Sequence, residues 1–422
     1  MKKGFADRKK TDVKHRDSEA YRVAYSHFVD CKSIWISELS AEAKSAIISF
    51  VNDHEDLFLQ IFAGSSFLTR IIRTRPEILI ELAQDGPDVF CEKILTHIYE
   101  QDLSCDQDGL MRYLRLCRQS MSLATAMADI AGIWSLDEVT GTLTDFADAS
   151  VRVSLDWLLK NRSVQYGLDA PPTADQCQCV ILGMGKYGAR ELNYSSDIDI
   201  VVFYEPEGIK SLDGYKLNEF WVELTKNLST ILQSTTDAGF VFRVDLRLRP
   251  DPGSTPVAVS IPAAEIYYES FGQNWERAAF IKARQIAGDK RTGDKLLAIL
   301  SPFIWRKNLD FAAIEDVHAM KRQIHAVRGH GQIAVAGHNI KLGRGGIREI
   351  EFFVQTQQLI AGGRDKSLRG SQTCPMLTRL AERGWIKTET VDELTAAYHF
   401  LRGIEHRLQM QQDEQTHTLP KT

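Results

Sequence analysis

Two aspartates, Asp197 and Asp199, stand one residue apart at the start of an apolar, β-branched run. Residues i and i+2 of a strand point to the same face, so both carboxylates can reach one site while Ile198 and Ile200 face the core. A third acid, Asp245, lies in the strand-like segment RVDLRLRP. Oxygen ligands with no Cys or His nearby suit Mg²⁺, with Mn²⁺ as a substitute, rather than zinc. The three acids therefore predict a two-metal site for in-line attack at phosphorus.

The glycines Gly183, Gly185 and Gly188 offer a different interpretation, because they spell G-x-G-x-x-G. A dinucleotide-binding fold needs an acid about 20 residues later, at the end of the second strand. Here the acids follow Gly183 by 14 and 16 residues and begin their strand. A kinase is also excluded, because the tripeptide HRD at 15–17 precedes the glycines. An aspartate pair alone could merely cap a turn, but a glycine turn followed by D-x-D and a later acid is the nucleotidyltransferase pattern.

The elements that must hold these residues are a small sheet and its covering helices. CVILG (179–183) and IDIVVFY (198–204) predict two buried strands, and GFVFRVDLRLRP (239–250) predicts a third that Pro250 ends. A long helix over 215–234 carries an apolar stripe on one face. Together these segments predict a mixed sheet with helical cover.

Helical patterns flank this core on both sides, so the expected fold class is α+β. Four regions are expected: a flexible basic tail (1–17), a helical region (18–168), the nucleotidyltransferase core (169–305) and a second helical region (306–422). Within the first helical region, Ser135 and Glu138 have the spacing of a capping box.

Composition narrows the class of protein further. Among 422 residues, 51 Lys and Arg against 56 Asp and Glu give a net charge of -5, which disfavours a nucleic-acid-binding surface. Seven scattered cysteines are typical of a reduced, cytoplasmic protein. The sequence has neither a secretory signal nor an apolar run of about 18 residues, so we expect a cytoplasmic protein without membrane contact.

Five segments, in this order, resemble a single family: GMGKYGARELNYSSDIDI, GFVFRVDLRLRP, YYESFGQNWERAAFIKAR, IKLGRGGIREIEFFVQ and FLRGIEHRLQMQQDEQTHTLP. The family is that of the bacterial glutamine synthetase adenylyltransferase/adenylyl-removing enzymes, and the resemblance runs from about residue 65 to the end. Its members carry two nucleotidyltransferase halves joined by a regulatory region. One D-x-D cassette and the helical lead-in resemble the amino-terminal, adenylyl-removing half. The resemblance therefore implies that half, present as a fragment, with a core similar to DNA polymerase β.

Two positions depart from the family pattern. Ala189 stands where a glycine is usual, and LRPDPGSTP (248–256) replaces the usual LRPFG. Neither departure includes a carboxylate, although the second could reshape the pocket for adenine or phosphate.

The resemblance also implies a reaction. Inorganic phosphate would attack the α-phosphorus of an adenylylated tyrosine on glutamine synthetase, releasing ADP and the free tyrosine. Asp197 and Asp199 would bind both metal ions, and Asp245 would bind the ion on the nucleophile side. The implied partners are adenylylated glutamine synthetase, phosphate, ADP or ATP and, through the full-length enzyme, a PII-type signalling protein.

Further residues are expected to contact phosphate groups through N–H or hydroxyl donors: Gly183, Gly185, Ser196, Arg247, Arg249, Arg344 and Arg348. Glycine allows the backbone to approach a phosphate closely. Arg247 and Arg249 alternate with leucines on the predicted Asp245 strand, so they should share its face and clamp the attacking phosphate. Ordinary ion pairing along the strand is the alternative for these two arginines.

Other functions remain open. The same acids could transfer AMP from ATP onto the tyrosine, since they do not set the reaction direction. An RNA nucleotidyltransferase is disfavoured because the chain is acidic overall. A catalytically silent module that binds glutamine synthetase or a regulator would not need all three acids.

Overall fold

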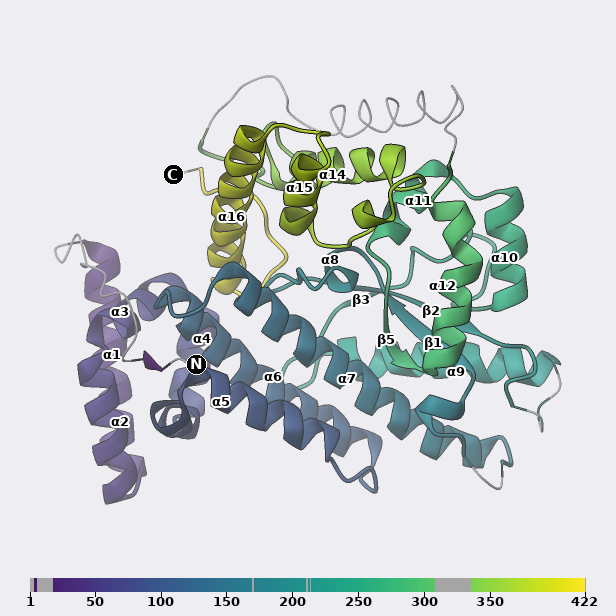
Figure 1. The fold of residues 1–422 in the computed structure, drawn as a ribbon. Coiled ribbons are helices and arrows are strands. Elements are labelled where there is room, and N and C mark those ends of the chain that lie inside the picture. Colours follow the sequence, from purple (N-terminus) through teal and green to yellow (C-terminus); the bar gives the residue numbers. More distant parts are fainter. Residues whose placement is uncertain are drawn as a thin grey trace.

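A computed structural model describes residues 4–5, 18–168, 171–209, 212, 214–307 and 335–421 (Figure 1). The predicted basic tail lies almost entirely outside these residues. Within them, helices predominate and surround a small mixed sheet of five strands, which confirms the predicted α+β class. The predicted domain boundaries stay predictions.

Seven helices precede the sheet in the described part of the chain: α1 (Glu19–Glu38), α2 (Ala41–Asp53), α3 (Glu55–Gly64), α4 (Ser66–Thr74), α5 (Glu77–Tyr99), α6 (Gln107–Ile130) and α7 (Leu136–Gln165). Several begin at a side chain that accepts a hydrogen bond from the first turn, as helix N-caps do. The predicted capping box is present: the Ser135 and Glu138 side chains each accept from the other residue's backbone N–H. None of the described helices is both long and apolar enough to cross a bilayer.

The sheet contains β1 (Cys179–Gly183), β2 (Ile198–Tyr204), β3 (Val244–Asp245), β4 (Ala258–Ser260) and β5 (Arg284–Gly288). Its order is β3-β2-β1-β5, and β4 also pairs with β2. Strand β1 is antiparallel to β2 and β5, whereas β2 is parallel to β3 and β4. The central strands are buried on both faces, which explains their continuous apolar sequence.

Helices cover both faces of the sheet. Alternate residues of β1 and β2, such as Ile181 and Ile200, pack into one core with α7 and α9 (Gly214–Gln233). Their neighbours, such as Leu182 and Val201, pack into a second core. The helices of that second core are α10 (Ile261–Ser270), α11 (Asn274–Ile281) and α12 (Lys290–Ile304).

A third group of helices follows in sequence: α14 (Ile347–Ala361), α15 (Thr373–Glu382) and α16 (Thr388–Met410), with a 3-10 turn η3 (Lys366–Leu368) between α14 and α15. They share a core of their own, and Figure 1 shows them together at one side of the molecule, next to the short helix α8 (Gly185–Gly188). A second 3-10 turn, η2 (Ala174–Gln176), precedes β1.

The predicted third strand over 239–250 is wrong in extent, because β3 contains only Val244 and Asp245. The Arg247 N–H donates to Asp245 Oδ1 (2.8 Å), and this side-chain-to-backbone bond turns the chain out of the sheet. Arg247 and Arg249 therefore do not share a strand face with Asp245.

We expect Ser135→Ala to lower the free energy of unfolding by about 0.5–2 kcal/mol, because α7 loses its N-cap. Urea unfolding followed by circular dichroism measures the change. Ser33→Ala is the matched control, since the Ser33 hydroxyl donates only to the Val29 carbonyl of its own helix. Equal losses in both variants would contradict the prediction.

Candidate active site

Parallel pairing of β2 and β3 brings two of the predicted acids together. Asp199 lies directly opposite Asp245 in the register, and Asp197 precedes β2 by one residue. Ile198 and Ile200 are fully buried in the core below them. The alternation expected from the sequence is therefore present, and the three aspartates gather at one edge of the sheet.

The glycine turn before α8 lies against Asp199. The Met184 N–H donates to the Asp199 carbonyl (2.8 Å), which ties the turn to β2. Gly185 has a φ of +54°, and a Cβ there would come 2.9 Å from Asp199 Oδ2. Only glycine combines this backbone conformation with room for the carboxylate.

The other two glycines of the motif permit close packing inside the protein. A Cβ at Gly183 would lie 2.9 Å from Ile286 Cγ2, and one at Gly188 only 1.9 Å from the Lys282 carbonyl oxygen. The glycine spacing is thus explained without a dinucleotide. Phosphate binding by the backbone at Gly183 and Gly185 stays a prediction.

The surroundings of Asp199 disfavour the charged form of its carboxyl group. Burial, together with the negative charges of Asp245 and Asp197, raises the pKa of Asp199 to about 7. The positive charges of Lys341 and Arg247 only partly oppose this shift. A cation placed among the three carboxylates would relieve the repulsion.

Two arginines hold the remaining acids. Arg243 Nε donates to Asp197 Oδ1 (2.6 Å), and its Nη2 donates to the Ser195 carbonyl (2.7 Å). Arg247 makes a forked contact with Asp245, with Nε 3.0 Å from each carboxylate oxygen. Its side chain is nevertheless 82% exposed, so it can move away at little cost. No role for Arg243 was predicted from the sequence, although its position two residues before Asp245 was an available signal.

The residues fit a hard divalent cation through their chemistry. Three carboxylates from adjacent strands offer only oxygen ligands, which Mg²⁺ prefers. Among the described residues, however, no group of three or more His, Cys, Asp or Glu side chains is arranged so that it could hold a metal ion. Asp197 and Asp245 bond Arg243 and Arg247 instead. Metal binding would require these two arginines to yield carboxylate oxygens.

A cavity of about 490 Å³ opens beside the acids. Asp197 and Asp245 line it together with Arg243 and Arg247, and Lys226 and Ser229 of α9 line it as well. Its mixture of carboxylates and cations suits a phosphate bound next to metal ions.

Comparison with known proteins identifies the family to which the chain belongs. The profile described as "Glutamate-ammonia ligase adenylyltransferase" matches residues 56–299, more than half of the chain. The chain belongs to this family. A second profile, "GlnD PII-uridylyltransferase", matches residues 318–422.

Individual members of the glutamate-ammonia ligase adenylyltransferase family are similar over most of the chain. A Brucella melitensis biotype 1 protein is 48% identical over 400 residues, covering 92% of this chain and 41% of its own length. A Bradyrhizobium diazoefficiens protein is 45% identical over 426 residues, covering 99% and 43%. Both are described as "Bifunctional glutamine synthetase adenylyltransferase/adenylyl-removing enzyme". The chain thus spans about two fifths of the length of these relatives.

The other residues predicted to bind phosphate lie in surroundings that differ from one residue to the next. The Arg249 guanidinium donates to the carbonyls of Leu246 (2.9 Å) and Pro252 (2.7 Å), so it holds the turn after β3 together. Ser196 is half-buried next to Asp197. Arg344 and Arg348 are exposed around the start of α14. Phosphate binding by all four stays a prediction.

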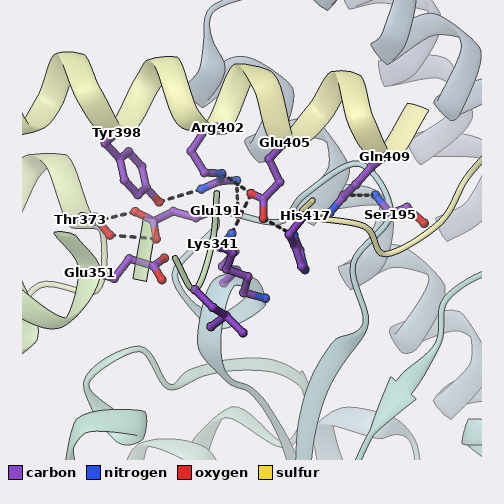
Figure 2. A network of polar contacts seen from close by, with 12 residues as sticks. Glu191, Ser195, Lys341, Glu351, Thr373, Tyr398, Arg402, Glu405, Gln409 and His417 are labelled. Carbon is purple, nitrogen blue, oxygen red and sulfur yellow. Dashed lines mark hydrogen bonds and ion pairs between the residues drawn. The ribbon is translucent and has the colours of Figure 1, made fainter. Parts of the chain in front are cut away.

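Sequence reasoning did not foresee the buried ionic network in Figure 2. Lys282 Nζ lies 2.9 Å from Glu191 Oε2 and 3.2 Å from Glu351 Oε1. Burial alone would raise the pKa of Glu351, but the charges of Lys282 and Lys186 lower it to about 2. Lys282 thus joins Glu191, which follows the glycine turn, to α14, and Lys186 of α8 pairs with Glu405 of α16.

We expect Asp199→Asn to stabilise the protein more strongly at pH 8 than at pH 5, in the presence of a chelator. The folded-state pKa of about 7 exceeds the ordinary value of 3.8, so the wild type loses stability as the pH rises through this window. The advantage of the variant should grow by roughly 2–3 kcal/mol between the two pH values.

Urea unfolding at both pH values measures this difference. Asp175→Asn is the control, because the Asp175 side chain is 72% exposed. An advantage that is the same at both pH values, or smaller at pH 8, would show that Asp199 is an ordinary carboxylate.

Proposed function

We propose that this chain is an adenylyl-removing domain that phosphorolyses adenylyl-tyrosine on glutamine synthetase. Inorganic phosphate is the attacking group, and ADP is the product. The observation that carries the proposal is the parallel register of Asp199 with Asp245, with Asp197 beside them. Family membership supports the same chemistry, because the similar proteins carry both adenylylating and adenylyl-removing activities in their descriptions.

The three aspartates would hold two Mg²⁺ ions, for which Mn²⁺ can substitute. Asp197 and Asp199 would contact both ions, and Asp245 the one nearer the attacking phosphate. When bound, the ions neutralise the charge that gathers on the phosphates and align the attacking and departing oxygens. Arg243 and Arg247, released from the carboxylates, become free to bind phosphate oxygens in the adjoining cavity.

The reaction needs no strong base. An oxygen of the phosphate forms a bond to the α-phosphorus of the adenylyl group, and the bond from that phosphorus to the tyrosine oxygen breaks. The bonding electron pair stays on the tyrosine oxygen, which then takes a proton from solvent. Phosphate is largely dianionic near neutral pH, so its oxygen needs no deprotonation before attack. The chain's task is therefore to position two anions next to each other.

Two sequence features support the adenylyl-removing direction: the helices α1–α7 before the sheet, and the segment RELNYSSDIDI (190–200), which runs into β2. The second candidate function is AMP transfer from ATP onto the tyrosine, favoured by the description of the family profile as an adenylyltransferase. As part of the proposal, the domain works in the cytoplasm, without nucleic acid or membrane. A PII-type protein would control it through the full-length enzyme.

We expect the protein to release ADP from adenylylated glutamine synthetase when Mg²⁺ and phosphate are both present. Asp197→Asn/Asp199→Asn should lower the rate at least about 100-fold, because the metal ligands are lost. Nucleotide release is followed by chromatography, with Asp175→Asn as the control.

Other products identify other reactions. AMP in place of ADP would mean that water is the nucleophile and would refute phosphorolysis. Adenylylation of unmodified glutamine synthetase from ATP, without nucleotide release, would establish the second candidate function.

The two arginines after β3 should have separable effects. Arg247→Ala removes an exposed cation beside Asp245, so we expect the KM for phosphate to rise about tenfold at unchanged stability. Arg249→Ala removes bonds to the turn, so we expect a loss of about 1–3 kcal/mol in the free energy of unfolding. Steady-state kinetics and urea unfolding of both variants test this. The reverse pattern would make Arg249 the phosphate ligand.

A further inference from the structure

One face of α16 contacts the chain segment that leads to the catalytic acids. Arg402, Glu405 and Gln409 are spaced by three and four residues, which places them on the same side of a helix. All three have 0% exposure. Figure 2 shows them pointing from α16 toward Glu191 and Ser195. We call these three residues the α16 face.

The segment they contact is 186–195, called here the catalytic loop, which runs from the glycine turn to the D-x-D pair. Near its start, Lys186 Nζ donates to Glu405 Oε2 (2.9 Å). In its middle, Arg402 Nη2 donates to the Glu191 carbonyl (2.7 Å). At its end, the Ser195 N–H donates to Gln409 Oε1 (2.8 Å). The α16 face thus binds the loop at three points along its length.

Both ends of the catalytic loop adjoin a catalytic acid. Lys186 follows Gly185, whose missing side chain makes room for the Asp199 carboxylate. At the other end, Ser195 accepts from Arg243 Nη2 through its carbonyl, and Arg243 Nε donates to Asp197 (2.6 Å). A shift of the loop would therefore move the surroundings of both acids.

The contacts from α16 require the burial of charged and polar groups, which costs free energy. Arg402 and Glu405 are fully buried charged groups and the Lys186 side chain is only 12% exposed, whereas apolar residues of similar size generally stabilise a core as well or better. Gln409 gives its Oε1 to the Ser195 amide while its Nε2 is buried without a hydrogen-bond partner. Such groups fix the direction and length of the contacts between α16 and the catalytic loop, rather than raising the free energy of unfolding.

The carboxyl-terminal end of α16 is fixed by further contacts. Arg407 Nη1 lies 2.7 Å from Asp129 Oδ2 of α6, and Arg118 Nη2 lies 2.6 Å from Asp413 Oδ1, just after the helix. The Ser66 hydroxyl, at the start of α4, donates to the Gln411 carbonyl (3.2 Å). Helices of the amino-terminal region therefore hold the carboxyl-terminal end of α16 in place.

We propose that the α16 face positions the catalytic loop and thereby sets Asp197 and Asp199 in their reactive arrangement. Arg402, Glu405 and Gln409 are positioning residues, since they act through Lys186, Glu191 and Ser195. The inference rests on the proposed function for its kinetic consequence, but its structural part can be measured separately.

The test uses Gln409→Met, which keeps the side-chain length and removes the acceptor for the Ser195 amide. The substitution leaves the helix α16 intact. Glu393→Gln, at an exposed position of the same helix, is the control. We expect kcat to fall at least about tenfold while the KM values for phosphate and glutamine synthetase stay within about twofold. We also expect faster deuterium uptake in peptides covering residues 190–197, at a nearly unchanged melting temperature.

Lys186→Met serves if Gln409→Met fails to fold. Glu405 keeps Arg402 (3.2 Å) and His417 (2.9 Å) as partners, so its charge stays paired and a folded protein with a low kcat is expected. An unchanged kcat in a folded variant would overturn the proposal, even with faster deuterium uptake.

Deuterium uptake decides the structural part independently of activity. If the wild type neither removes nor transfers AMP, the proposed function fails. Faster uptake across 190–197 in Gln409→Met would then still support positioning by α16, and unchanged uptake would overturn it.

Discussion

The parallel pairing of β2 with β3 places the Asp199 and Asp245 carboxylates opposite each other, with Asp197 two residues away. Like charges at this spacing repel each other, and burial strengthens the repulsion. Burial first, and then the charges of Asp245 and Asp197, raise the pKa of Asp199 to about 7. Arg243 and Arg247 bind two of the acids and so oppose this repulsion, and the absence of a side chain at Gly185 leaves room for the third carboxylate.

Contacts from α16 form a second layer behind the three acids and hold the catalytic loop. The sheet supplies only short stretches of backbone, because β3 has two residues and the catalytic loop lies outside any strand. The buried groups of α16 compensate by binding that loop through side chains. Since α16 is in turn held by α4 and α6, the amino-terminal helices and the sheet contribute to one active site.

Local patterns in the sequence predicted the local parts of this structure. Alternation around Asp197 and Asp199 indicated their common side, and the spacing of Ser135 and Glu138 indicated a helix start that the structure confirms. The end of β3 was missed because it depends on the Asp245 side chain bonding a backbone amide, which alternation cannot reveal. Arg243 and Lys186 were missed because their partners are distant in sequence. Arg243 binds an acid 46 residues earlier, and Lys186 binds one 219 residues later.

Diffraction from a Mn²⁺-soaked crystal, collected at an energy where manganese scatters anomalously, tests the central claim most directly. The account predicts two anomalous peaks about 3.5–4 Å apart among Asp197, Asp199 and Asp245, with Arg243 and Arg247 turned away from the carboxylates. A single structure would show both the ions and the displaced arginines. Intact arginine–aspartate pairs without a peak between the acids, at saturating Mn²⁺, would contradict a metal-dependent phosphoryl site here.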